Sequence, residues 1–570
     1  MSLVSAAFAN AVVKSSRAHR SKGPHQIQFT EDWRNNEIME WHHSFGPRPT
    51  KIQMFQLRRE RSKTLKHQYV VLILSDNCIL RLDRRGEEDK PVDTMIAGTK
   101  SIDTIGDVKS LAHLDKTSDF LAELHCQSSN VDLLDIIKIC FGIHRDHEAG
   151  RYTLQRFNCY FFAWTVLLAT ARHIVRWDTL PSDSPWETMS QTLANALSTR
   201  SADAMINLMI NGTVAAVMAT RHVLKSQLSR VMSRRARFAW AMPEWLIRFA
   251  LRLMLQKSGM SGIQTALRLR MQSELLSTLR PTLYSVMKNM RLDTLRTTLW
   301  KEDVENAMRT AAQRDVMNNV LKAVTTAVSG LELTTDDVDA FRSQAGKWGD
   351  PDFLGGRKGD WRPAIIAAFR ALVQASRRFA VPEAHVLITD NETWDEIWNS
   401  IRDIVRDASK EAMNEAMKET KEDGWTGLWD DFMEVWPAAW EALRPEIRDT
   451  ARATLKELTE LANDSLAYCV RETLPDTHVH LDVRDMGSRL RHVSRSKFIA
   501  GLANTTQSEL QPYMLKHIQD HSRLVGRYRL GSPADVESDM RKAMGRVWTA
   551  VVDLDGGDAS ASGDHAEDVS

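Results

Sequence analysis

Short apolar runs separated by turn residues fill the first third of the chain and predict a small β-rich domain. Tyr69–Leu74 is a continuous aliphatic and β-branched run, as expected of a buried strand. Ser75-Asp76-Asn77 supplies a turn, and Cys78–Leu82 returns as a second strand. Alternation predicts another strand over Lys51–Leu57. Two further segments are strand-like by the same criteria: Lys100–Val108 and Leu121–Cys126.

An uncharged apolar run from Phe157 to Ala171 follows a strand-like segment, Tyr152–Leu154. The run is shorter than the roughly 20 apolar residues that cross a membrane, so it predicts a helix buried in a globular domain. Asn158 stands at the N-cap position, which makes Cys159 the first helical residue. The helix dipole and free amides there favour a thiolate and can hold an oxyanion. Cys159 is therefore a candidate nucleophile, and simple core packing is the alternative.

His67 opens the predicted buried strand and is the candidate partner of Cys159. A histidine in that place can be held rigidly against a thiol on a facing helix, as a Cys-His pair requires. A surface or capping role is the alternative for a single histidine near a strand end. Arg81 and Asp83, on the return strand, are candidates to orient the imidazole, while Asn158 would shape the start of the helix.

These residues and their order resemble the circularly permuted papain-like thiol families. The families include the lecithin:retinol acyltransferase-like enzymes and the permuted deubiquitinating and deSUMOylating peptidases, in which histidine precedes cysteine. His67 falls on their strand histidine. The positions that fall on their Asn-Cys box are Tyr152, Leu154, Asn158, Cys159 and Phe162. The resemblance covers about residues 45–180, and the whole arrangement is also similar to a family of large fungal proteins without an established activity.

The resemblance implies a thiol hydrolase or acyltransferase. Cys159 would attack an acyl carbonyl of an amide, isopeptide or lipid ester, with His67 as base and then acid, and no cofactor would be needed. The acyltransferase branch carries a further histidine on the return strand, where this chain has Arg81 and Asp83. The peptidases need no third member. The alternative is a non-catalytic helical scaffold with a decayed papain-like unit, which the lack of a third polar partner favours.

Beyond Trp186 the apolar residues recur at three- and four-residue spacing, which predicts helices. The expected fold class is therefore an α+β N-terminal domain, with a small antiparallel sheet packed on the Cys-bearing helix, followed by a large, mainly α-helical region. The expected divisions are a permuted papain-like domain (31–180), a basic helical region (186–343), a Gly- and Asp-rich loop (347–360) and an acidic helical region (361–552).

The charge of the helical part is divided unevenly. Residues 221–300 carry 15 Lys and Arg against three acids, interleaved with Trp and Phe, whereas residues 381–450 carry 18 acids against seven basic residues. Two such helical layers can pack together and neutralise each other. The alternative is peripheral contact of the basic helices with an anionic membrane. Nucleic acid is not expected, since no recognised binding module is present.

The ends of the chain and its cysteines bear on localisation. Residues 1–30 are basic and free of acids, which predicts a disordered tail or, alternatively, a mitochondrial presequence. Residues 553–570 form a polar, acidic tail that predicts disorder. The five cysteines are scattered, without a disulfide or zinc pattern, so we expect an intracellular, cytoplasmic protein. The binding partner and oligomeric state stay open.

Two histidine-containing motifs do not predict a metal site. The cluster His144, Asp146, His147 and Glu148 is typical of a solvated loop. His478-Val479-His480 has the HxH pattern of metal-dependent amidohydrolases, but their (β/α)8 barrel needs roughly 200 or more residues after it, and 90 follow here. We therefore expect a strand-like turn or loop between helices at this position.

Overall fold

The chain forms two compact units in a computed structural model. The structure describes residues 24–61, 67–87, 94, 98–126, 130–175, 177, 183–223, 241–257, 260–289, 292–330, 390–420, 426–474, 476–482 and 505–563. Unit 1 comprises Met1–Leu180, Arg291–Val304 and Leu474–Ser570, and unit 2 comprises Pro181–Met290 and Glu305–Thr473. The acidic helical region was predicted to extend over residues 361–552. Its predicted end is wrong, because residues from 474 onward belong to the same unit as the N-terminal domain. The predicted loop 347–360 lies outside the described residues.

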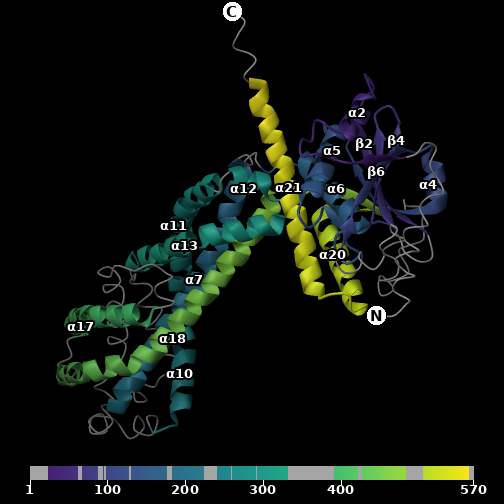
Figure 1. Ribbon diagram of the computed structural model, residues 1–570. Helices are drawn as coiled ribbons and strands as arrows, with labels where there is room; N and C mark the ends of the chain where they lie inside the picture. Colours follow the sequence, from purple (N-terminus) through teal and green to yellow (C-terminus); the bar gives the residue numbers. More distant parts are fainter. Residues whose placement is uncertain are drawn as a thin grey trace, which may run out of the picture. The chain divides into compact units, whose positions relative to one another are not determined.

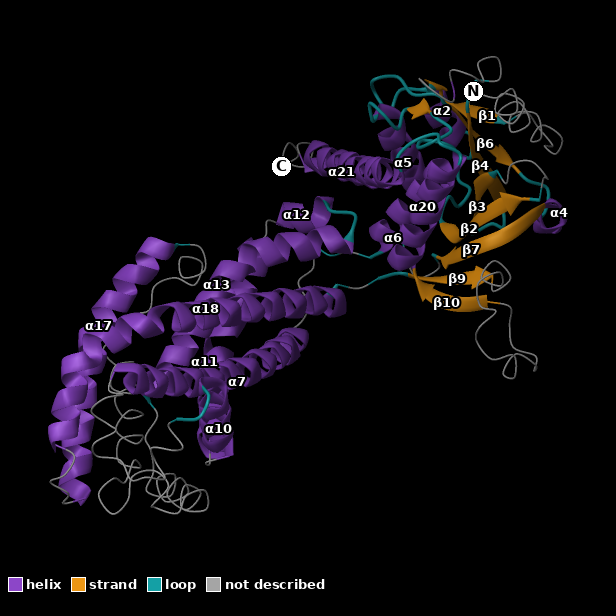
Figure 2. Cartoon of the chain, turned by 90° about the horizontal axis from the view of Figure 1, so that it is seen from below, coloured by secondary structure: helices purple, strands orange, loops and turns teal. Residues whose placement is uncertain are grey.

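Unit 1 is built on an eight-stranded antiparallel sheet (Figure 2). Its strands, in spatial order, are β1 (His25–Ile27), β6 (Ile102–Asp107), β4 (Ile79–Arg85), β3 (Gln68–Leu74), β2 (Ile52–Glu60), β7 (Ser118–His125), β9 (His478–Asp482) and β10 (Thr505–Glu509). A separate two-stranded sheet pairs β5 (Thr99–Lys100) with β8 (Arg151–Tyr152). The strands predicted from alternation are thus present, and β1, β9 and β10 extend the sheet at its two edges.

The buried position of β3 inside the sheet explains why the sequence of this strand is apolar throughout. All seven of its residues are buried. Val70, Leu72 and Leu74 belong to the main core of unit 1, while Tyr69, Val71 and Ile73 form a smaller cluster with Leu114 of α4 (Leu111–Thr117). A strand covered on both faces reads as a continuous hydrophobic run, because successive side chains point to opposite faces.

The Cys-bearing helix is buried in the main core, as predicted. Helix α6 (Cys159–Ile174) packs against β2, β3, β4, α5 (Leu133–Arg145), α20 (Leu510–Arg527) and α21 (Pro533–Gly563) (Figures 1 and 2). Gly142 of α5 allows close approach of α21, since a Cβ at that position would lie 3.1 Å from the Val547 carbonyl oxygen. Two short helices, α2 (Glu37–His43) and α12 (Leu292–Thr297), complete the unit. The expected α+β fold class is confirmed.

Three expectations about local order need correction. His25–Ile27 is a strand rather than part of a disordered tail, because it pairs with β6. Helix α21 continues to Gly563, so residues 553–563 are helical, while 1–23 and 564–570 lie outside the described residues. His478–Asp482 is strand β9, paired between β7 and β10 rather than looped between helices.

Among its described residues, unit 2 contains helices and no strand. Its helices are α7 (Asp183–Val223), α10 (Glu244–Lys257), α11 (Met260–Asn289), α13 (Lys301–Ser329, from Glu305 onward), α17 (Asn391–Thr420) and α18 (Thr426–Thr473). Helix α7 packs along α11 and α18. One core cluster joins α7, α17 and α18 through three tryptophans, and the Trp398 and Trp440 rings stack with centroids 4.2 Å apart. Repeated apolar faces therefore hold this unit together.

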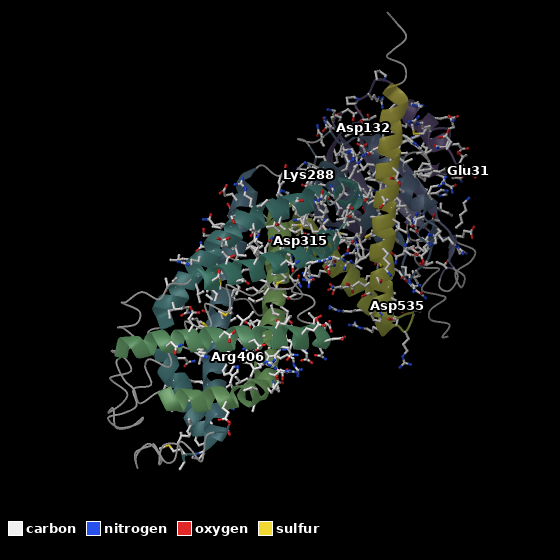
Figure 3. The ribbon with its side chains drawn as sticks, turned by 90° about the vertical axis from the view of Figure 1, so that its left-hand side faces the viewer. Glu31, Asp132, Lys288, Asp315, Arg406 and Asp535 are labelled. Atoms are coloured by element: carbon white, nitrogen blue, oxygen red, sulfur yellow. The ribbon has the colours of Figure 1, made fainter. Side chains whose placement is uncertain are left out.

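The basic helix α10 and the acidic helix α18 are joined by an individual ion pair. Arg248 of α10 lies 3.2 Å from Glu446 of α18, which links the two regions within unit 2. On the same helix α10, Trp245 and Phe249 are exposed by 69% and 60%. Lys288, Asp315 and Arg406, which Figure 3 labels, are exposed residues of their helices. Within the described residues, no helix has the length and apolar character needed to span a membrane.

Candidate thiol active site

Cys159 is the first residue of α6, where the sequence placed it. Asn158 is the N-cap: its side-chain oxygen accepts from the amides of Tyr160 at 2.9 Å and Phe161 at 3.2 Å. Its side-chain nitrogen donates to the Leu154 carbonyl at 2.8 Å. Asn158 therefore fixes both the helix start and the preceding turn. Cys159 itself is 4% exposed.

His67 lies one residue before β3 and is buried. Its Nε2 is 2.7 Å from Oδ1 of Asp83, so the carboxylate, which can only accept, receives the Nε2 proton. This leaves Nδ1 as the ring nitrogen available to the Cys159 side chain, which interacts with the imidazole and raises its pKa. The structure thus brings together the two residues that the sequence proposed as a pair, although 91 positions separate them in the chain.

Asp83 and Arg81, the two candidates on β4, have different positions in the site. Asp83 is fully buried and contacts the imidazole directly. Arg81 donates to Asp83 from Nε at 2.8 Å and from Nη2 at 2.9 Å, and it also binds Glu60. The Arg81 guanidinium lies over the Tyr69 ring at 3.6 Å. Asp83 therefore orients His67, and Arg81 orients Asp83.

The electrostatics favour a protonated imidazole at His67 and an ionised carboxylate at Asp83 at neutral pH. Burial by itself lowers the pKa of His67, but the negative charge of Cys159 and the hydrogen bonds with Asp83 and Cys159 raise it to about 10. Burial also opposes the ionisation of Asp83, but the Arg81 charge and the His67 hydrogen bond hold the pKa of Asp83 well below its usual range. The imidazolium therefore lies between a carboxylate and the sulfur of Cys159.

Tyr152 of β8 completes the surroundings of the cysteine. Its buried hydroxyl accepts a hydrogen bond from the backbone amide of Cys159, and burial raises the pKa of Tyr152 well above its usual range. The ring packs on Gly86, where a Cβ would lie 2.8 Å from Tyr152 Cδ1. The hydroxyl therefore stays protonated beside the sulfur, at the end of the helix where an oxyanion would be stabilised.

Other buried cysteines in unit 1 have a different environment. Burial raises the pKa of Cys126 to about 12 and the pKa of Cys140 further still, beyond the range in which a thiolate forms at neutral pH. Both belong to the main apolar core. The contrast distinguishes Cys159, which has a buried histidine as its neighbour, from cysteines that fill space.

Sequence reasoning missed two features around the site. Gln68, next to His67, accepts from Trp164 Nε1 of α6 at 2.8 Å, which ties β3 to the Cys-bearing helix. The C-terminal helix α20 also packs on the start of α6. The apolar pattern of α20 predicted a helix, but no local signal in the sequence indicated what it would contact.

Residues of the two histidine motifs contact other side chains of unit 1. His480 of β9 lies against His125 of β7, with ring centroids 5.1 Å apart. Asp146 and Glu148 both bind Arg546 of α21, at 2.6 and 2.7 Å. Among the residues that the structure describes, no group of three His, Cys, Asp or Glu side chains is arranged to hold a metal ion.

Comparisons with protein-family profiles, with curated proteins and with solved structures gave no significant match. The resemblance to the permuted papain-like families therefore depends on the site residues and their order along the chain.

Proposed function

We propose that this protein is a cysteine-dependent hydrolase or acyltransferase that acts on an amide, isopeptide or lipid ester through Cys159, His67 and Asp83. One observation carries the proposal: a cysteine at a helix N-terminus lies close enough to a buried histidine to raise the pKa of that histidine, whose Nε2 donates to a buried aspartate. This is the arrangement by which nucleophile, base and orienting group act together.

The reaction follows from the positions of the protons. The Cys159 thiolate forms a C–S bond to the acyl carbon, and the positive end of the α6 dipole stabilises the oxyanion. His67, protonated at Nδ1, gives that proton to the leaving amine or alcohol as the scissile bond breaks. The neutral imidazole then takes a proton from water or from an acceptor alcohol or amine, which attacks the thioester and releases Cys159.

Asp83 supports catalysis over the scaffold alternative. From the sequence, the lack of a third polar partner favoured a decayed unit, whereas Asp83 on β4 supplies a third polar group at hydrogen-bond distance from His67. A decayed site has no need to keep a carboxylate buried beside an imidazole, because burying charge without function is costly. The substrate is proposed to be a protein or a lipid, with no cofactor.

Labelling of Cys159 with iodoacetamide between mildly acidic and mildly alkaline pH tests the proposal. We expect native wild-type protein to react at Cys159 from mildly acidic pH, with the modified site identified by peptide mapping. His67→Ala should slow the reaction by about 10²–10⁴-fold, since the imidazolium partner is lost. Cys78→Ser is the matched control, because Cys78 is a partly exposed free cysteine outside the site. A Cys159 that stays inert until the protein unfolds would establish the scaffold alternative.

A second step identifies the bond that is cleaved. Aminomethylcoumarin amides of peptides, isopeptide-linked conjugates and phospholipid esters are incubated with wild type and Cys159→Ser. A covalent acyl adduct on Cys159, absent in Cys159→Ser, is the expected result for the true substrate class.

A further inference from the structure

The turn that presents Cys159 is held from a distant part of the chain. His521 of α20 donates from Nε2 to the carbonyl oxygen of Gln155 at 3.0 Å, across 366 residues of sequence. Because a carbonyl oxygen can only accept, Nε2 must carry the proton. Asn158 Nδ2 lies 3.4 Å from the same nitrogen while it donates to Leu154. His521 therefore holds the turn through its hydrogen bond to Gln155 and lies beside the N-cap of α6.

The protonation state of His521 suits a fixed donor. Burial lowers its pKa, and the hydrogen bond to Gln155 offsets only part of that effect. The ring is therefore neutral at pH 7, with one N–H directed at the turn. A neutral donor adds no charge to the His67–Cys159 pair.

The hydrogen bonds within the turn join residues that are close in sequence. Thr153 Oγ1 accepts from the amides of Arg156 at 3.3 Å and Phe157 at 3.0 Å. Together with the bond from Asn158 to Leu154, they shape the turn but do not locate it relative to the sheet. His521 supplies an anchor from another helix, so it limits rigid movement of the whole turn.

The same imidazole also contacts the helix that carries the cysteine. Its ring lies 5.5 Å from the Tyr160 ring and 6.2 Å from the Trp164 ring, centroid to centroid. Trp164 in turn donates to Gln68, the residue after His67. Contacts of His521 therefore reach the segments that bear both the thiol and the imidazole.

We infer that His521 is a positioning residue of the thiol site, which holds the Gln155–Asn158 turn so that the Cys159 sulfur stays within reach of His67. The inference rests on the proposed function, since only a working thiol pair needs this constraint. It assigns α20, from the C-terminal part of the chain, to the active site.

Three variants separate positioning from packing. His521→Leu keeps apolar bulk but removes the N–H, whereas His521→Gln keeps an N–H donor at similar reach. His517→Leu is the matched control, because His517 lies one turn earlier on α20 and packs on Trp164 with ring centroids 5.8 Å apart. The measurements are the iodoacetamide rate at Cys159, near neutral pH and in the full chain, and the thermal midpoint of each variant.

We expect His521→Leu to react about tenfold more slowly than wild type, because small misplacements of reacting groups are costly. His521→Gln should recover most of the rate, and His517→Leu should keep it even where its thermal midpoint falls. The inference is overturned if His521→Leu reacts at the wild-type rate, if His521→Gln is as slow as His521→Leu, or if His517→Leu slows the reaction equally. An inert Cys159 in wild type instead overturns the proposed function, and the inference with it.

Discussion

The two units of this protein place their charged side chains differently. In unit 1, Arg84 and Asp103 form an ion pair in which the side chains are 0% and 4% exposed, and Arg84 also donates to the Ala149 carbonyl. In unit 2, the pair Arg280 and Glu187 is 48% and 64% exposed. Both pairs have oxygen–nitrogen distances typical of ion pairs, 2.7 and 3.2 Å, so the difference between them is burial.

Burial changes what a charged group can do. An exposed pair is screened by water and contributes little, whereas a buried charge must keep its partner because a lone buried ion is very unfavourable. Unit 1 thus uses buried charges to fix side-chain positions, as in the row formed by Arg81, Asp83 and His67. Unit 2 is held by apolar faces and a tryptophan cluster, and its exposed ion pairs are accessory.

The largest expected effect comes from removing a buried charge of unit 1, compared with an exposed charge of unit 2. Asp103→Asn leaves the Arg84 guanidinium buried without its counter-charge and should reduce the free energy of unfolding by about 3–5 kcal/mol. Glu187→Gln, the matched change in unit 2, should cost less than about 1 kcal/mol. Urea denaturation followed by circular dichroism measures both. Equal losses in the two variants would remove the distinction between the units.

The second prediction concerns pH. The pKa of His67 is raised from its ordinary value near 6.5 to about 10 in the folded protein. The folded state then holds a proton that the unfolded state loses, so the stability from His67 is complete below about pH 6.5 and is lost as pH rises through about 10. The slope is at most about 1.4 kcal/mol per pH unit. Denaturation at pH 7 and pH 10 should show a steeper decline for wild type than for His67→Gln, and parallel declines would contradict the buried charged pair.

The smallest expected effect lies on the exposed face of α10. Trp245→Ala and Phe249→Ala should change the free energy of unfolding by no more than about 0.5 kcal/mol, because these side chains bury little surface. Trp440→Ala is the buried control, and it should cost about 3–5 kcal/mol since it leaves a cavity beside Trp398. A large loss in the α10 variants would mean that this face is covered.

The same α10 variants test the membrane expectation. Flotation of the full chain with phosphatidylserine vesicles should weaken when Trp245 or Phe249 is replaced, if this basic helix binds anionic lipid. Binding that is unchanged in both variants argues against α10 as the contact.

The sequence by itself determined the local elements of the site. A continuous apolar run predicts β3, and an asparagine before an uncharged run predicts the start of α6 at Cys159, because both signals depend on neighbours in the chain. His67 and Cys159 could be proposed as a pair from their places at the ends of these elements. The end of a strand was harder to predict where charged residues follow the apolar ones. Strand β2 was predicted to end at Leu57 but continues to Glu60, because buried Arg58 is paired with Asp115 and hydrogen bonded to Ser118.

Only the tertiary structure decided between Arg81 and Asp83, joined β9 and β10 to the N-terminal sheet, and placed His521 beside the Gln155–Asn158 turn. Each of these is a contact between segments that have no local signal for one another. A short strand such as His478–Asp482 has the same pattern whether it stands alone or pairs with β7. Its partner is chosen by the apolar surface and backbone hydrogen bonds that the rest of the chain leaves available, and that choice exists only once the chain has folded.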